Sequence, residues 1–420
     1  MTTLDVDECT THGAPHRVGP DFGQDPYPFL ADLARQGPVH RVQLPDGSDS
    51  WWVTDRDSVR AALGDHARFS SQVHNAVRSK DIENSQALIR KDSLLRLVMI
   101  NRDPPDHTRM RKLVVRAFGA PRVEALRPRL QEIADGLLDR LQDQDVVEVV
   151  SQYAFPMPVA VICELLGIPL SASERLGKFV SSMVGAASPD EARAAIGGLK
   201  EFITEVVAEK RANPADDVLS ELARAQDEGL LTPNELPAMA LQILSAGHES
   251  SIFVISAGLL HLLANPEALA KARADDEALT AAVHEILRLE PPPVPGVFRH
   301  ATTDVQIGGH TIPEGSLVVL SLAAANRDPV AFPDPHRFDI DRGENDHLSF
   351  GGGIHTCLGA RLAVVEATIA IGTIIRRFPD LRLAVEPEAI RRRPLNFLQR
   401  LNDLPVRLRA NVDAMSEGTS

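Results

Sequence analysis

The residues best suited to chemistry lie in a glycine-rich loop near the C-terminal end of the chain. Cys357 stands within Phe350–Ala360, which carries glycines at positions 351, 352, 353 and 359 and precedes a long apolar run. Glycine lets a backbone turn tightly and come close to a bulky flat ligand. The helix expected after the loop begins with partial positive charge, which favours a thiolate over a thiol. The pattern therefore predicts that Cys357 is a thiolate metal ligand.

A second candidate site interrupts a long apolar segment. Residues 232–235 read Thr-Pro-Asn-Glu, the form of a capping box, and apolar residues continue from there to Ala264. They predict a helix of about 30 residues, roughly 45 Å long. Its middle, residues 245–251, reads Ser-Ala-Gly-His-Glu-Ser-Ser, and polar side chains in an apolar helix are costly unless they are satisfied. The interruption indicates a functional site, although the Ser250 hydroxyl could instead bond back to its own helix.

A histidine and an arginine form the third candidate. Residues 103–111 read Asp-Pro-Pro-Asp-His-Thr-Arg-Met-Arg, which predicts a helix start because proline and aspartate favour the first turn. His107 and Arg111 are four residues apart and share one helix face. Together they could clamp a carboxylate, whereas the alternative interpretation is a solvated basic stripe.

These motifs resemble those of one protein family. The cysteine loop has the spacing Phe-Gly-x-Gly-x-His-x-Cys-x-Gly, which resembles the haem-binding loop of the cytochrome P450 family, the haem-thiolate monooxygenases. The segment around His107 resembles the helix that holds a haem propionate in that family. Residues 246–250 resemble the family's oxygen-site motif Ala/Gly-Gly-x-Asp/Glu-Thr, with serine in place of threonine. The resemblance runs from Asp25 to about Arg409.

The resemblance implies a fold and a cofactor. The fold class is mainly α with small β-sheets (α+β), in which a long central helix crosses over haem b. Cys357 would be the axial ligand of the haem iron, with Phe350 shielding the sulfur. The other cofactor-binding residues that it implies are His107, Arg111, Ala246, Gly247, Arg299, Gly351, His355 and Gly359, of which His107, Arg111, Arg299 and His355 would neutralise the two propionates.

The same resemblance implies an activity. Glu249 and Ser250 would be the catalytic residues that manage protons for oxygen activation, although serine lacks the methyl group that restricts the threonine rotamer. The enzyme would insert one oxygen atom from O₂ into a small organic substrate by hydroxylation or epoxidation, tailoring a natural product such as a macrolide or another polyketide. The substrate contacts that we expect are Val294, Pro295, Val297 and Phe397.

Electrons would come from NAD(P)H through a separate ferredoxin reductase and ferredoxin, because we find no flavin or iron–sulfur module in the sequence. A basic docking patch is expected at Arg109, Lys112, Arg116 and Arg361. Two other functions stay open at this point: a haem-thiolate binding or sensor protein without turnover, and an oxidase driven by peroxide.

A charged pair is expected to stabilise the fold on the cysteine side. Glu285 and Arg288 are three apart on a predicted helix and can pair. The resemblance implies that an arginine of Pro-x-Arg-Phe, here Arg337, locks this pair. We assign these residues to folding and not to catalysis.

The whole chain has the composition of a globular protein. It has 420 residues, 44% of them hydrophobic, and a net charge of -14, which makes it a poor candidate for binding nucleic acid. Its three cysteines, at positions 9, 163 and 357, indicate a reducing compartment. The sequence lacks an N-terminal signal peptide and an uninterrupted membrane span, so we expect a cytoplasmic monomer without a membrane anchor. One domain is expected over residues 21–412, between flexible ends at 1–20 and 413–420.

The remaining elements are predicted from periodicity and turn residues. Trp51 and Trp52 would lie on opposite faces of one strand. The expected strands are Val39–Leu44, Ser50–Thr54, Val305–Ile307, His310–Ile312 and Ser316–Ser321. A first helix is expected to open near Asp25 and to end at about Gln36. The other expected helices cover Phe155–Pro169, Ser173–Val184, Glu191–Arg211, Glu277 to Glu290 and Leu358–Arg377. Loops at Ser70–Arg96, Gly185–Asp190 and Asn396–Leu398 would shape the substrate pocket.

Overall fold

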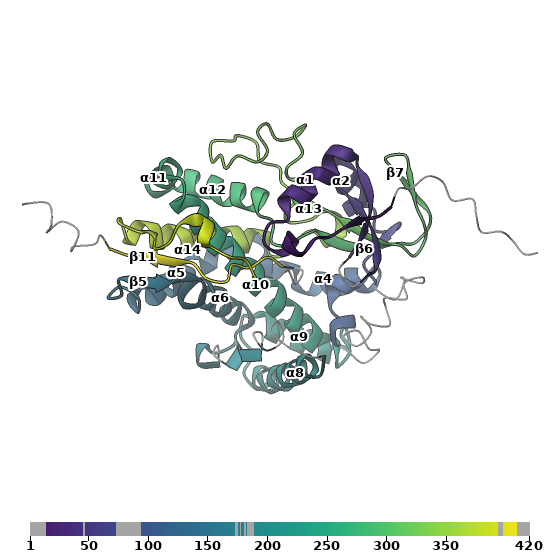
Figure 1. Ribbon diagram of the computed structural model, residues 1–420. Coiled ribbons are helices and arrows are strands. Elements are labelled where there is room, and N and C mark those ends of the chain that lie inside the picture. The colour runs from purple at the N-terminus through teal and green to yellow at the C-terminus, as the bar shows by residue number, and fades with distance from the viewer. Residues whose placement is uncertain are drawn as a thin grey trace, which may run out of the picture.

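Long helices dominate one half of the molecule, and the largest sheet lies in the other half (Figure 1). The computed structural model describes residues 14–44, 47–72, 94–172, 175–176, 178–179, 182, 189–393 and 398–409. The helices are α1 (Tyr27–Gln36), α2 (Arg56–Gly64), α4 (Asp106–Val114), α5 (Ala120–Asp139), α6 (Pro156–Leu166), α8 (Pro189–Ala212), α9 (Val218–Asp227), α10 (Glu235–Leu263), α11 (Pro266–Ala274), α12 (Asp276–Leu289), α13 (Leu322–Ala325) and α14 (Ala360–Arg377). The strands are β1 (His16–Arg17), β2 (Val39–Gln43), β3 (Asp49–Val53), β4 (Phe69–Ser70), β5 (Val146–Glu148), β6 (Val297–Ala301), β7 (Val305–Ile307), β8 (His310–Ile312), β9 (Leu317–Leu320), β10 (Arg382–Leu383) and β11 (Pro405–Arg407).

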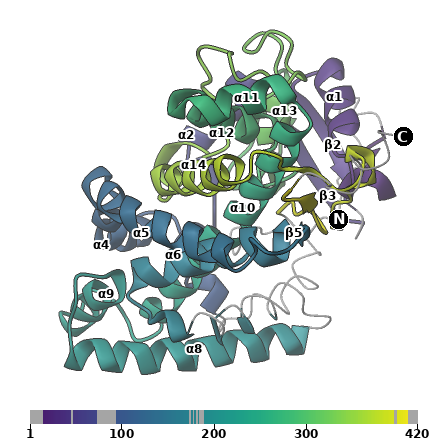
Figure 2. The same cartoon turned by 90° about the vertical axis from the view of Figure 1, so that its left-hand side faces the viewer.

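Helix α10 is the central element of the helical half. It packs between α6 on one side and α12 and α14 on the other, and Figure 2 shows it in the middle of the molecule. At its start the Glu235 carboxylate accepts a hydrogen bond from the Thr232 backbone N–H at 2.8 Å, which is one half of the predicted capping box. The helix is apolar and long enough to cross a membrane, but 67% of its most apolar window is buried inside the protein, as in the core helix of a soluble protein. The predicted long helix is therefore confirmed, with 29 residues.

The six-stranded sheet has the order β1-β2-β3-β9-β6-β4. Strand β3 pairs in parallel with β9, and β9 pairs antiparallel with β6, which carries Arg299. Trp51 packs into the hydrophobic cluster on one face of the sheet and Trp52 into the cluster on the other, as predicted. Strand β1 lies within the N-terminal segment that was expected to be flexible, yet it pairs in parallel with β2.

Two smaller sheets complete the strands. Strands β10, β11 and β5 form one, and the antiparallel pair β7 and β8 forms the other. The segment Ser316–Ser321, expected to share a small sheet with β7 and β8, instead supplies β9 to the six-stranded sheet. An isolated bridge between Pro293 and Leu398 brings the C-terminal segment against the chain that leaves α12. The predicted helix over Ser173–Val184 lies mostly outside the described residues. The same holds for residues 73–93 and 183–188 of the predicted pocket loops.

The charged pair on α12 is completely buried. Both side chains are 0% exposed, and Arg288 donates to the two Glu285 oxygens at 2.8 Å each. The prediction that the Arg337 side chain locks this pair was wrong: the Arg342 Nε donates to Glu285 at 3.1 Å, and Arg337 contributes only its backbone carbonyl, to Arg288. Residues 333–343 follow a turn-rich path, and this path decides which arginine reaches Glu285. It places the Arg337 main chain beside the Glu285–Arg288 pair and returns the Arg342 side chain to Glu285. The network anchors the segment that leads into the cysteine loop.

Candidate active site

The cysteine loop is closed by its own backbone. The Cys357 N–H donates to the Phe350 carbonyl at 2.8 Å, and the Gly351 N–H donates to the Leu348 carbonyl at 2.8 Å. Gly351 and Gly353 have φ values of 70° and 63°, a region that favours glycine. A Cβ at Gly353 would also overlap the Leu63 carbonyl oxygen at the end of α2. The glycines therefore allow a tight loop that packs directly against α2.

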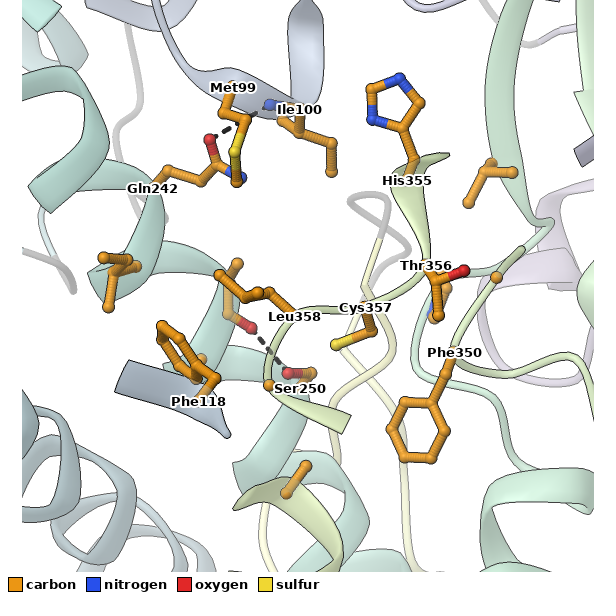
Figure 3. Close-up of a pocket in the computed structure, with 18 of the residues that line it drawn as sticks. Met99, Ile100, Phe118, Gln242, Ser250, Phe350, His355, Thr356, Cys357 and Leu358 are labelled. Carbon is orange, nitrogen blue, oxygen red and sulfur yellow. Dashed lines mark hydrogen bonds between the residues drawn. The ribbon is translucent and has the colours of Figure 1, made fainter. Parts of the chain in front are cut away.

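The Cys357 sulfur faces a cavity of about 350 Å³. Figure 3 shows the sulfur directed into the same space as Ser250 of α10. The Cys357 side chain is exposed to the cavity and not covered by protein on that side. The protein atoms around it still remove enough water that burial raises the pKa of the thiol. The Gly359 N–H and Arg111 oppose this effect without reversing it. In the protein alone, burial therefore opposes the predicted local preference for a thiolate, and a bound metal ion would favour the deprotonated sulfur.

Basic side chains gather at one end of the cavity. His107 is 2% exposed, its ring lies 4.3 Å from that of His355, and neither of its ring nitrogens has a hydrogen-bond partner among the described residues. Arg111 donates to the Thr356 carbonyl at 2.7 Å, and Arg299 donates to the Phe298 carbonyl beside it at 2.7 Å. In the described part of the chain neither arginine forms an ion pair with a carboxylate.

Burial sets the protonation of this basic cluster. It lowers the pKa of Arg299 to about 10, so the guanidinium stays charged at neutral pH. Burial, followed by the charge of Arg299, lowers the pKa of His355 to about 3. The His355 Nε2 lies 3.0 Å from the Ser71 hydroxyl. The cluster thus combines two charged arginines with two histidines and has unused hydrogen-bonding capacity.

Helix α10 supplies the opposite wall of the cavity. Ala246, Gly247 and Ser250 line it, and a Cβ at Gly247 would lie 3.1 Å from the Ile162 side chain. The Ser250 hydroxyl donates to the Ala246 carbonyl at 2.7 Å, so the alternative of a bond back to its own helix is the one adopted here. A hydroxyl in this state keeps its oxygen free to accept a further hydrogen bond from the cavity.

Glu249 turns away from the cavity. It does not line the cavity, and both of its oxygens accept hydrogen bonds from Arg400 at 3.2 Å. Burial alone would raise the pKa of Glu249, but His248 and Arg400 outweigh it and lower that pKa. His248 itself is buried with its ring against Phe155. The sequence therefore brings Ser250 to the cavity but places its neighbour in a buried ion pair.

A carboxyl group that the sequence analysis did not assign to the site lies on α14. Glu366 lines the cavity, and its Oε2 accepts a hydrogen bond from the Ser251 hydroxyl at 3.0 Å. Its Oε1 is buried without a partner among the described residues. Burial raises the pKa of Glu366 to about 8, so the group is mostly protonated at neutral pH. The sequence signal that could have identified Glu366 is its position as a single acidic residue within the apolar run of α14.

Comparisons with known proteins agree with this geometry. A family model described as "Cytochrome P450" matches residues 179–400. Cytochrome P450 107B1 of Saccharopolyspora erythraea is 42% identical over 398 residues, which cover 92% of this chain and 96% of that protein. The chain belongs to the cytochrome P450 family. The 6-deoxyerythronolide B hydroxylase of the same organism is 40% identical over 92% of this P450 chain and 97% of its own. The tirandamycin C-bound structure of the P450 monooxygenase TamI has a TM-score of 0.86, with 40% identity over 94% of this chain and 100% of that one.

This P450 is a monooxygenase, and its family implies haem as the cofactor. The residues present fit that group. Haem carries two carboxylates, and the cavity offers buried, unpartnered nitrogens on His107 together with Arg111 and Arg299. Haem iron in this class takes a thiolate, and the one cysteine that lines the cavity in the described chain is Cys357.

The expected substrate contacts divide into three groups. Val297 lines the cavity. Val294 is completely buried in the core beside the six-stranded sheet, and neither it nor Pro295 lines the cavity. Phe397 lies outside the described residues. Pro293, within the segment Pro292–Val297 that was expected to pass beside the pocket, lines the cavity, and sequence analysis missed Gln242 and Asn101, which also line it.

One of the four residues expected to form the basic docking patch, Arg109, already has carboxylate partners within the chain. Arg109 pairs with Glu235 at 2.6 Å and with Asp106 at 3.1 Å, which neutralises its charge. Lys112, Arg116 and Arg361 are exposed. Val115, 45% exposed, lies next to Arg116 and adds an apolar contact to this surface.

Proposed function

We propose that the Cys357 thiolate binds the iron of haem b and that His107, Arg111, Arg299 and His355 hold its propionates. The observation that supports this assignment is that one cavity is lined by Cys357, the only one of the two described cysteines to line it, by the basic cluster and by Ser250. When bound, the cofactor supplies oxygen activation and the transfer of one oxygen atom to the substrate. The residues of the chain bind the cofactor, orient the substrate, exclude water and supply protons.

Glu366 and the α10 hydroxyls would supply those protons. A carboxyl group whose pKa is about 8 is protonated at neutral pH and can donate to Ser251, which also lines the cavity. Ser250 would position a water or hydroxyl at the same wall through its free lone pair. Glu249 would take part only after release from Arg400. We therefore assign the proton supply to Glu366 in addition to the Glu249–Ser250 pair suggested by the sequence motif.

The substrate would be an apolar natural product of polyketide type that is hydroxylated or epoxidised. Support comes from the mostly aliphatic wall, formed by Met99, Ile100, Val161, Ile162, Ile243 and Val297. A 6-deoxyerythronolide B hydroxylase and the tirandamycin C-bound TamI are both 40% identical to this chain. Such a wall binds extended hydrophobic molecules by burying their surface.

Electrons would come from NAD(P)H through a ferredoxin reductase and a ferredoxin in the cytoplasm. The exposed charges of Lys112, Arg116 and Arg361 would attract an acidic ferredoxin despite the negative total charge. Product formation with this reconstituted chain, compared with peroxide alone, separates the two electron sources.

The haem assignment is tested with the reduced carbon-monoxide spectrum. Wild type should show the red-shifted band of a thiolate-ligated haem, and Cys357→Ala should lose it. Cys163→Ala serves as the control, because Cys163 is buried in α6 away from the cavity. A wild-type protein without the red shift, or a Cys357→Ala variant that keeps it, contradicts the assignment. Substrate-induced spin-state shifts across a panel of macrolactones and linear polyketides then test the substrate class.

A further inference from the structure

One polar side chain stands in the aliphatic wall of the cavity. Gln242, Ala246 and Ser250 are spaced by four residues on α10, and all three line the cavity. Residues at this spacing share one helix face. Gln242 therefore lies on the same face as Ser250, two helical turns towards the N-terminus of α10. The axial rise between them is about 12 Å, from eight residues at 1.5 Å each.

The orientation of the Gln242 amide is determined by a backbone donor. Its Oε1 accepts a hydrogen bond from the Ile100 N–H at 3.1 Å (Figure 3). A backbone N–H can only donate, so the carbonyl end of the amide must face Ile100. The NH₂ end then points elsewhere, and no described residue accepts a hydrogen bond from it.

None of the described side chains that line the cavity around Gln242 accepts a hydrogen bond from this NH₂ group, so it is available to a ligand. Met99, Ile100 and Ile243 are apolar neighbours of Gln242 in the cavity lining. Asn101 also lines the cavity, but its amide nitrogen donates to the Leu95 carbonyl at 2.9 Å. A substrate that fills this space removes water from the Gln242 NH₂, which is costly unless the substrate offers an acceptor.

We infer that Gln242 is a specificity-determining residue whose NH₂ group donates to a carbonyl, ether or hydroxyl oxygen of the substrate. The acceptor lies on the order of 10 Å from the carbon held beside Ser250, because the two α10 positions are two turns apart. This deepens the proposed function and rests on it, since the oxidised carbon is placed by the cofactor. It restricts the substrate to extended molecules with an oxygen acceptor remote from the site of oxidation, and disfavours plain hydrocarbons of equal size.

The test uses synthetic probes that are anchored at the iron. Two series of 1-alkylimidazoles with graded chain lengths end either in a methyl ketone or in the isosteric isopropyl group, and ligand-induced haem spectra give their dissociation constants. In wild type the ketone should bind about fivefold more tightly than its isopropyl partner at one chain length, as a single hydrogen bond predicts. Gln242→Met removes the whole amide, and Gln242→Glu removes the NH₂ group while keeping an acceptor for the Ile100 N–H. Both should lose the ketone preference.

The matched control is Gln226→Glu, the same chemical change on α9 outside the cavity lining, which should keep the wild-type preference. A ketone preference that survives in Gln242→Met, or in Gln242→Glu at a pH at which the introduced carboxyl is ionised, overturns the inference. So does the lack of any preference in wild type, provided that the isopropyl probes bind. If the isopropyl probes produce no haem shift in wild type and the carbon-monoxide spectrum lacks the thiolate band, the proposed function fails and the inference fails with it.

Discussion

Replacing Glu366 with glutamine should stabilise the protein increasingly as pH rises. The carboxyl is buried between α14 and α10, where burial raises its pKa from 4.5 to about 8. Between these two values the unfolded chain has lost the proton that the folded protein still holds. Folding stability of wild type therefore falls with rising pH across this window and levels off above pH 8. Glutamine is neutral in both states and does not carry this dependence.

The size of the effect follows from the shift. Each pH unit in the window changes the free energy of unfolding by about 1.4 kcal/mol. Over the three units from pH 5 to pH 8, the free energy of unfolding of Glu366→Gln should therefore rise by about 4 kcal/mol relative to that of wild type. Because glutamine can still bond to the Ser251 hydroxyl, the gain is not cancelled by loss of that contact.

The assay is urea denaturation of the haem-loaded protein at pH 5, 6, 7 and 8. Glu148→Gln is the control, because burial would raise the Glu148 pKa but hydrogen bonds from Ser151, Leu404 and Val150 lower it below 4.5. Glu148 is then ionised in both states throughout this range, and its variant should differ from wild type by a constant amount. A difference between Glu366→Gln and wild type that is equally constant with pH would refute the buried-acid argument, and with it the proton supply assigned to Glu366.

Three further outcomes are expected. Glu285→Gln should destabilise the folded protein by about 3–5 kcal/mol in urea denaturation, because it leaves a buried guanidinium without its counter-charge. The same substitution at the exposed Glu124, which pairs with Arg127 at the same spacing, should have no measurable effect. Arg116→Glu should slow reduction by ferredoxin several-fold and flatten its salt dependence in stopped-flow measurements. Arg400→Met should cost about 3 kcal/mol at pH 7, and the loss should shrink at lower pH as Glu249 becomes protonated.

Each outcome has a result that contradicts it. Equal stability of the Glu285 and Glu124 variants would mean that the buried network adds nothing. Unchanged reduction kinetics in Arg116→Glu would move the docking surface elsewhere. A stability loss in Arg400→Met that grows as pH falls would show that Glu249 is not an ionised partner of Arg400.

The sequence predicts those features that depend on local pattern. The span of α10, the cysteine loop and the alternation of Trp51 and Trp52 each follow from spacing within one segment, and the structure confirms them. Glu285 and Arg288 were also paired correctly, since they are three positions apart on one helix.

The sequence did not predict features that depend on contacts between segments far apart in the chain. Glu366 faces Ser251 across 115 positions, and Arg400 reaches Glu249 across 151. Arg342 replaces Arg337 because the path of an irregular segment, and not its motif, decides which side chain returns to α12. Burial of Cys357 by surrounding segments, which raises the pKa of its thiol, also could not be read from the loop sequence.

The pairing of β3 with β9 has a consequence for the order in which the newly made chain can fold. Trp51 aligns with Val318, so the inner edge of β3 has no partner until 267 more residues have been synthesised. At 5–20 residues per second this takes roughly 15–50 s. During that time β1, β2 and β3 expose an unpaired strand edge, which can pair with other chains. The cysteine loop follows β9 in the sequence, so Cys357 is synthesised only after the strand that covers this edge of β3, and chains lost through the exposed edge would be lost before that loop exists.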